Sequence, residues 1–304
     1  MKKFVTGFFM AWGCFTVIPC LYKKWDENAR DHMLFALPFI GLIVGELWYA
    51  LYFVVQKCLE LPGLLTAVIL AFFPMLLTGF IHIDGYMDCC DAIGSRRPQE
   101  DKLRILKDSH VGAFACIGLA FWALLSTGAM DAALSAQEAA ELSTSTVTAR
   151  TSFLMGGTAE LLPCIILIPA VSRFMSAISV WSYPPLSTSQ YNRSKNEGVV
   201  ATISEDGTVK SGTVGKVGKR GRANLTIPMV IVMLLLFAIF FAIFDRATFT
   251  HLATRTELVF VVEMVAYHIA CHHARKQLGG MSGDISGYSI TIAELAAIIT
   301  IALL

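Results

Sequence analysis

Long apolar stretches alternate with short polar segments along almost the whole chain. Each stretch is close to the length of about 20 residues that an α-helix needs to cross a lipid bilayer. The pattern predicts an all-α, polytopic integral membrane protein with about seven transmembrane helices. We place them at 33–55, 63–83, 111–130, 155–181, 226–244, 257–271 and 285–304.

The amino terminus begins like a secretory signal peptide but departs from one where cleavage would occur. Lys2 and Lys3 precede an apolar run, as in a signal peptide. Pro19 and Cys20, however, interrupt the region that should hold small residues. We therefore expect this segment to be retained as an interfacial or re-entrant helix.

Two polar stretches interrupt the apolar pattern. Residues 131–152 are rich in Ala, Ser and Thr and are expected to form an irregular polar insert on the outer side of the membrane. Residues 182–225 include the Gly- and Lys-rich sequence EDGTVKSGTVGKVGKRGR and are expected to form a mobile cytoplasmic polar loop. The whole chain, 1–304, is interpreted as a single membrane-embedded domain.

Composition supports a membrane protein and argues against a nucleic-acid partner. Of the 304 residues, 55% are hydrophobic and 15% are charged, whereas soluble domains contain roughly 25% charged residues. The formal net charge of +1 gives no electrostatic reason to expect binding to a polyanion. The eight cysteines include no Cys-x-x-Cys pair and are interpreted as small buried apolar residues.

Lysine and arginine are concentrated in alternate connections between the apolar stretches. The connections 84–110, 182–225 and 272–284 hold most of them, whereas 132–154 and 245–256 hold few. Because basic residues mark the cytoplasmic ends of membrane helices, the three basic connections are expected to lie together on the cytoplasmic side.

An acidic cluster follows the second apolar stretch, in the sequence HIDGYMDCCDAIG. Asp84, Asp88 and Asp91 are spaced i, i+4 and i+7, which places them within an arc of about 60° on a helix. Three carboxylates on one face repel one another unless a cation lies between them. Because Mg²⁺ prefers oxygen ligands and is often completed by substrate phosphates, we expect a magnesium site, with Gly85 leaving room for a phosphate. An ordinary solvated helix end is the alternative.

Two further groups of polar residues lie in the same connections. Lys107, Asp108 and Ser109 come just before the third stretch, where the first amide groups of a helix and the lysine would form an anion site. Asp284 lies in a Gly- and Ser-rich turn, where glycine permits the close approach of a ligand. Helix capping and ordinary loop chemistry are the alternatives. His82 either contacts the acidic site or packs inside the bundle.

The segment GFIHIDGYMDCCDAIGSRRPQEDKLRILKDSHVGAFA resembles the signature of the adenosylcobinamide-GDP ribazoletransferase, or cobalamin synthase, family. That signature reads H-x-D-G-x-x-D-x-x-D-[AG], then a short arm, then K-D-S-x-[VIL]-G. The chain matches it at His82, Asp84, Gly85, Asp88, Asp91, Lys107, Asp108, Ser109 and Gly112. GGMSGD, followed by Glu294, is similar to a second block of the family, and VSRFMS, which contains Arg173, resembles a weaker middle block. Another middle block, YNRSKNEG, lacks the expected Ala-Arg-Pro.

The resemblance implies a transferase reaction at a diphosphate. A ribose hydroxyl of α-ribazole, or of its 5′-phosphate, attacks the cobinamide-side phosphorus of adenosylcobinamide-GDP, and GMP leaves. It implies Mg²⁺ on Asp84, Asp88 and Asp91, and catalytic roles for Asp91, Asp108 and Lys107, with the choice of general base between Asp91 and Asp108 left open. Substrate contacts are expected from His82, Gly85, Ser109, Arg173 and Asp284.

The same resemblance implies where the protein works and with what. The expected location is the bacterial cytoplasmic (inner) membrane, with the active site facing the cytoplasm. The expected partners are the two substrates and the lipid bilayer, with no nucleic acid, and a homo-oligomer is left open.

Two other classes of membrane protein share some of these features. CDP-alcohol phosphotransferases carry D-G-x-x-A-R-x₈-G-x₃-D-x₃-D, but Met87 and Asp88 replace Ala-Arg here, and the later Gly and Asp pair are missing at their distance. A secondary transporter should hold charges within its spans and often shows paired halves, whereas the motif acids here gather at one membrane face. Both classes are kept as alternatives to the transferase.

Overall fold

The computed structural model describes the chain except for residues 1, 21, 23, 145–163, 187–218 and 245–250. The described residues form helices, turns and an isolated bridge between Pro185 and Met281, which confirms the all-α class. The helices are α1 Lys2–Phe15, α2 Arg30–Phe53, α3 Gly63–Leu77, α4 Ile81–Gly94, α5 Gln99–Ile105, α6 Ala113–Thr144, α8 Cys164–Ser182, α9 Lys219–Phe244, α10 His251–Leu278 and α11 Gly283–Leu303. A 3₁₀ turn, Glu27–Ala29, precedes α2, and a π-helical turn, Val54–Cys58, follows it.

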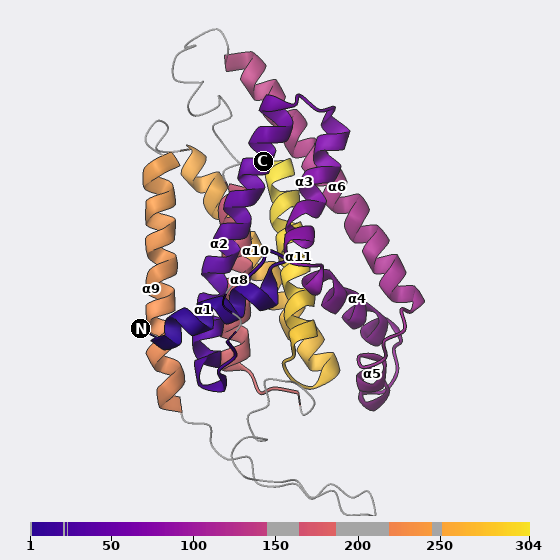
Figure 1. Cartoon of the computed structure of the whole chain (residues 1–304). Coiled ribbons are helices and arrows are strands. Elements are labelled where there is room, and N and C mark those ends of the chain that lie inside the picture. Colours follow the sequence, from indigo (N-terminus) through magenta and orange to yellow (C-terminus); the bar gives the residue numbers. More distant parts are fainter. Residues whose placement is uncertain (1, 21, 23, 145–163, 187–218, 245–250) are drawn as a thin grey trace, which may run out of the picture.

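The helices form an elongated bundle. In Figure 1, α9 stands at the left edge and α6 at the right edge, with α11 running between them. Four helices are long and apolar enough to cross a membrane, and α3 and α4 taken together would make a fifth span. The four lie at Glu27–Cys58, Ala113–Glu138, Cys164–Ser182 and Gly283–Leu303. Membrane character is therefore borne out, but the expected seven spans are not confirmed within the described residues.

The second apolar stretch is broken rather than straight, which corrects the expected span 63–83. α3 and α4 meet at an angle of 92°. Between them, Gly79 and Phe80 have φ angles of 62° and 61°, in the left-handed region that an ordinary helix cannot contain. Thr78 closes α3 by donating its hydroxyl to the carbonyl of Pro74 at 2.9 Å. The break turns α4 away from the axis of the bundle, as Figure 1 shows.

α1 lies against the beginning of α2. A Cβ on Gly7 would lie 2.6 Å from the carbonyl carbon of His32, so the two helices touch through their backbones. Met10 and Ala11 are buried on α1. At 1.5 Å per residue the helix is about 21 Å long, too short for the roughly 30 Å of a hydrocarbon core. The amino-terminal segment is thus a helix too short to span, and its interfacial or re-entrant position stays a prediction.

Helices extend into both segments that the sequence indicated as polar inserts. α6 includes residues 131–144, so the irregular structure expected there is corrected. The physical reason is their content of Ala, Leu, Glu and Gln, which are good helix formers. α9 likewise includes residues 219–225 of the expected cytoplasmic loop. Residues 183–186 follow α8 outside a helix, and residues 145–152 and 187–218 of the inserts lie outside the described residues.

Two glycines one turn apart bring α2 and α8 together. A side-chain carbon on Gly41 would overlap the carbonyl of Pro169, and one on Gly45 would overlap the carbonyl of Ile166. Small residues four positions apart are a common means of close packing between membrane helices. The largest buried apolar cluster includes Trp48 of α2 and several residues of α8, so this contact lies at the centre of the bundle.

Replacing Gly45 with Ala is expected to destabilise the bundle, because the added methyl group would push α8 away from α2. Overpacking of this kind costs about 1–3 kcal/mol, which thermal unfolding of the purified protein in detergent would detect. Gly128→Ala on α6 is the matched control, because nothing lies within 4 Å of the methyl group that it adds. A Gly45→Ala protein as stable as the control would contradict the backbone contact.

Candidate functional site

The described parts of the three basic connections come together at one end of the bundle, as the distribution of charges predicted. Lys102 of α5 donates a hydrogen bond to Gln277 near the end of α10. The guanidinium of Arg275 lies 3.2 Å from the centroid of the Tyr183 ring, which follows α8. Parts of all three connections therefore share one side of the protein, and the cytoplasmic location of that side stays a prediction.

At this end, α4 is held against the first turns of α11 by backbone contact. A Cβ on Gly85 would lie 2.8 Å from the Cα of Asp284, and one on Gly287 would lie 2.8 Å from the carbonyl oxygen of His82. The hydroxyl of Thr291 donates to the same oxygen at 3.3 Å. Gly85 therefore faces α11, so the structure gives it a packing role in place of the expected room for a phosphate.

The acidic residues expected at the site are brought together. Asp84, Asp88 and Asp91 all lie on α4, and Asp284 lies in the first turn of α11. Asp84, Asp284 and Asp91 each act on Asp88 as a repelling negative charge. Asp84 is exposed, whereas Asp88 and Asp284 are partly buried. The corner between α4 and α11 is thus a concentration of negative charge that a cation would relieve.

This corner fits a particular kind of metal ion. No group of three His, Cys, Asp or Glu side chains in the described part of the chain is arranged to enclose an ion. Mg²⁺ does not need such a cage, because it usually binds through one or two carboxylates and keeps water and phosphate oxygens as its other ligands. Asp84 and Asp88, with Asp284 beside them, offer oxygen donors of this type at an accessible position.

Asp91 has partners that the sequence did not indicate. Its Oδ2 accepts a hydrogen bond from the backbone N–H of Gly112 at 2.7 Å, and its Oδ1 accepts one from Ala115 at 2.9 Å. The carboxylate therefore caps the first turn of α6, whose N–H groups have no partner within the helix. These contacts favour a structural role for Asp91 over its expected roles as metal ligand and general base.

The loop before α6 carries the second group of predicted residues. Lys107, Asp108 and Ser109 are all exposed, and α6 begins beyond them at Ala113, so they do not form the helix end itself. Asp108 accepts a hydrogen bond from the backbone N–H of His110 at 3.1 Å, and its Oδ1 lies 2.6 Å from the Nδ1 of that ring. The hydrogen bonds from His110 lower the pKa of Asp108, and the same contact raises the pKa of His110.

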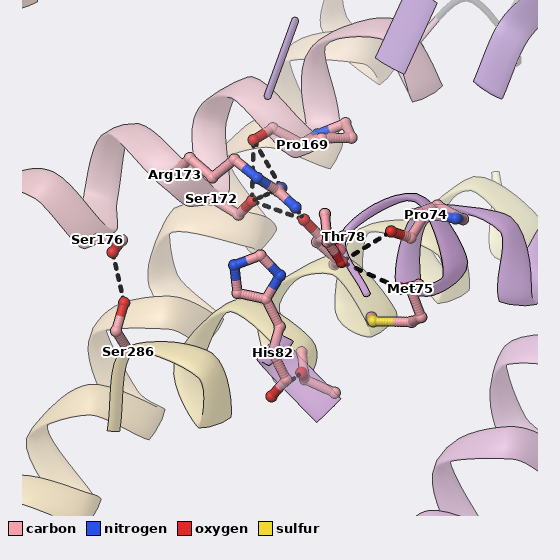
Figure 2. A network of polar contacts seen from close by, with 11 residues as sticks. Pro74, Met75, Thr78, His82, Pro169, Ser172, Arg173, Ser176 and Ser286 are labelled. Atoms are coloured by element: carbon pink, nitrogen blue, oxygen red, sulfur yellow. Dashed lines mark hydrogen bonds and ion pairs between the residues drawn. The ribbon is translucent and has the colours of Figure 1, made fainter. Parts of the chain in front are cut away.

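Two residues expected to contact substrate lie inside the bundle instead. The exposed fractions of His82 and Arg173 are 5% and 2%. Arg173 forms an ion pair with Glu294 at 2.7 Å, and the His82 ring stacks on Phe15 with 6.4 Å between the ring centroids. Figure 2 shows His82 beneath the side chains of Ser172 and Arg173. In this arrangement both residues are enclosed by protein, so the geometry does not favour direct contact with substrate.

Two buried acids near Arg173, Glu263 and Glu294, were not among the predicted site residues. Glu294 on α11 is its partner, and Glu263 on α10 has no exposed surface. The sequence contained a signal for both acids, because ionisable residues within apolar stretches are rare and are usually paired inside the protein.

Comparison with known proteins identifies the family. The family model described as cobalamin-5-phosphate synthase matches residues 7–302. The chain belongs to this family. It is 31% identical over 304 residues, all of both chains, to an adenosylcobinamide-GDP ribazoletransferase of Clostridium perfringens. It is 28% identical over 298 residues to a protein of the same name from Clostridium botulinum, covering 98% of this chain and 97% of the relative.

A third relative, from Lachnoclostridium phytofermentans, is also named adenosylcobinamide-GDP ribazoletransferase. It is 26% identical over 295 residues, covering 97% of this chain and 92% of the relative. No solved structure matches this chain. Membership of the cobalamin-5-phosphate synthase family confirms the resemblance seen in the sequence and disfavours both the CDP-alcohol phosphotransferase and the transporter.

Replacing Asp91 with Asn is expected to destabilise the protein, because an amide nitrogen cannot accept one of the two backbone hydrogen bonds. Helix caps contribute about 0.5–2 kcal/mol, and thermal unfolding would measure the loss. Asp101→Asn is the control, because Asp101 forms a surface ion pair with exposed Arg104, at 3.3 Å, and does not cap α6. Normal stability together with lost activity in Asp91→Asn would argue for a catalytic role instead.

Proposed function

We propose that this protein is an adenosylcobinamide-GDP ribazoletransferase. It joins adenosylcobinamide-GDP to α-ribazole, or to α-ribazole 5′-phosphate, and releases GMP; the product is adenosylcobalamin or its 5′-phosphate. The family match over residues 7–302 carries this proposal. It is supported by relatives of that name that align with the chain over its full length.

The reaction exchanges one phosphorus–oxygen bond for another. A ribose oxygen forms a bond to the cobinamide-side phosphorus and loses its proton, and GMP departs with the electron pair of the bond that breaks. Reactions of this type depend mainly on in-line positioning and on neutralisation of the phosphate charges. The protein therefore needs to place its charges correctly rather than to form a covalent intermediate.

Asp84 and Asp88 are the residues that would hold Mg²⁺, with Asp284 beside them on α11. When bound, the ion would supply positive charge next to the diphosphate and the departing GMP. Asp88 is partly buried and experiences the negative charges of Asp84, Asp284 and Asp91, so a cation at this position would relieve the repulsion. The backbone contact at Gly85 keeps Asp284 close to this pair.

Asp108 and Lys107 complete the proposed site from the exposed loop. Both oxygens of Asp91 accept backbone hydrogen bonds, whereas the carboxylate of Asp108 is exposed to solvent, where a substrate hydroxyl can reach it. We therefore favour Asp108 as the base that takes the ribose proton. Lys107, its exposed neighbour, is the proposed contact for a substrate phosphate.

The proposed active site faces the cytoplasm of a bacterial inner membrane. Both substrates are polar molecules for which an aqueous compartment is the natural source. The acidic corner and the exposed loop belong to the end of the bundle where the basic connections meet, and basic residues mark the cytoplasmic side.

Purified protein in detergent should release GMP from adenosylcobinamide-GDP only when α-ribazole and Mg²⁺ are both present. Chromatography of nucleotides would follow the product, and chelation followed by return of Mg²⁺ should abolish and restore it. A family member of known activity, assayed with the same reagents, is the positive control. Failure to release GMP under conditions where that control succeeds would reject the proposed function.

Asp84→Asn and Asp88→Asn should each lower the rate of GMP release by about 100-fold or more, a loss comparable to removal of one preorganised charge-stabilising group. The reason is that each variant removes a negative oxygen ligand while keeping the shape of the side chain. Asp101→Asn should retain full activity. Wild-type rates in either of the first two variants, at limiting Mg²⁺, would refute the metal assignment.

A further inference from the structure

Four ionisable side chains from four helices meet in the interior of the bundle, apart from the exposed acidic corner. Arg173 of α8, Glu263 of α10, Glu294 of α11 and His82 of α4 have exposed fractions of 2%, 0%, 3% and 5%. Glu294 and Arg173 both act electrostatically on Glu263, and Arg173 acts on His82. The mechanism proposed above gives no task to this group.

Arg173 and Glu294 are fixed to each other and to α8. Arg173 Nη1 lies 2.7 Å from Glu294 Oε1 and 3.0 Å from the carbonyl oxygen of Pro169. The hydroxyl of Ser172 donates to the same Glu294 oxygen at 2.8 Å. Figure 2 shows Pro169, Ser172 and Arg173 on one helix, directly above the His82 ring. Glu294 therefore ties α11 to α8 through two donors.

The same face of α11 also contacts α4, because Gly287, Thr291 and Glu294 are spaced i, i+4 and i+7 along the helix. Gly287 abuts the carbonyl of His82, and the Thr291 hydroxyl donates to that carbonyl at 3.3 Å. Glu294 follows Thr291 by less than one helical turn. His82 in turn lies in the first turn of α4, the helix that carries Asp84 and Asp88. The contact that fixes α4 against α11 therefore lies within one helical turn of the buried ion pair.

Stability alone is a poor explanation for this group. Removing ionisable groups from water is costly, and a buried ion pair can often be replaced by apolar residues without loss of stability. Here the structure buries two further polar groups beside the pair. Both carboxylate oxygens of Glu263 and the Nδ1 of His82 have no hydrogen-bond partner among the described residues. What these buried polar side chains can provide instead is one defined arrangement of the helices that carry them.

We propose that Arg173 and Glu294 are positioning residues, whose ion pair sets the separation between the α4 carboxylates and Asp284 and thereby the affinity of this corner for a divalent cation. Arg173 is buried, and its side chain donates to Pro169, Ser172 and Glu294, so it acts through α11 and α4. The inference rests on the proposed function only for the identity of the cation.

The test is direct binding of Mn²⁺, used as a probe for Mg²⁺, to the full-length protein in detergent. The electron paramagnetic resonance signal of the free ion measures how much Mn²⁺ remains unbound. The double variant Arg173→Met/Glu294→Met removes the pair but keeps apolar volume. It should melt near the wild-type temperature, yet bind Mn²⁺ about 10-fold more weakly, the lower end of the effect seen when residues that orient metal ligands are lost.

Ser172→Ala provides a milder test that does not alter the charges. It removes one of the two donors to Glu294 and should weaken Mn²⁺ binding without a change in melting temperature, whereas Ser172→Thr, which keeps the hydroxyl, should restore binding. Ser289→Ala is the matched control, because this buried serine of α11 donates to the Ile285 carbonyl of its own helix. Binding in this variant should equal that of the wild type.

The outcomes separate the inference from the proposed function. Wild-type affinity for Mn²⁺ in the folded double variant would overturn the inference. If the double variant does not fold, unchanged affinity in Ser172→Ala would overturn it equally, as would a wild-type protein that fails to bind Mn²⁺. If wild-type protein binds Mn²⁺ and Ser172→Ala weakens it, the inference stands even where no GMP is released, and only the proposed reaction is lost.

Discussion

Gly85 and Gly287 let α4 and α11 touch through their backbones, and the candidate site depends on this contact. No side chain fits between the helices at either position, since an added Cβ would lie 2.8 Å from main-chain atoms of the other helix. Carboxylates carried by different helices are thereby placed at one corner, although Asp88 and Asp284 repel each other. Packing of the two backbones thus opposes the electrostatic force that would separate these groups.

The break between α3 and α4 explains how an apolar stretch leads directly into an acidic helix. A straight continuation would carry Asp84 and Asp88 along the axis of the bundle. The turn of 92° instead directs α4 sideways, across the first turns of α11. The left-handed conformation of Phe80 is costly for a residue with a side chain. Its presence indicates that the contacts made by α4 in this position stabilise the protein by more than the local strain costs.

Charged residues fall into two groups with different surroundings. Asp84, Lys107 and Asp108 are exposed to solvent at one end of the bundle, where ions and phosphates can reach them. Arg173 and Glu294 are buried and bonded to each other. Exposed charges can exchange their partners for a ligand. Separating a buried ion pair is strongly destabilising, because it leaves an uncompensated charge inside the protein. The two groups are therefore suited to binding and to positioning, respectively.

The sequence by itself determined the all-α membrane class, the gathering of the basic connections on one side and the acidic face of α4, because apolar length, charge asymmetry and helical spacing are local properties. It also contained the motifs of the family. Only the tertiary structure decided that Gly85 packs against Asp284, that Asp91 caps α6, and that Arg173 pairs with Glu294 inside the bundle. These contacts join residues from different helices, and no periodicity within one helix encodes which neighbour its side chains will meet.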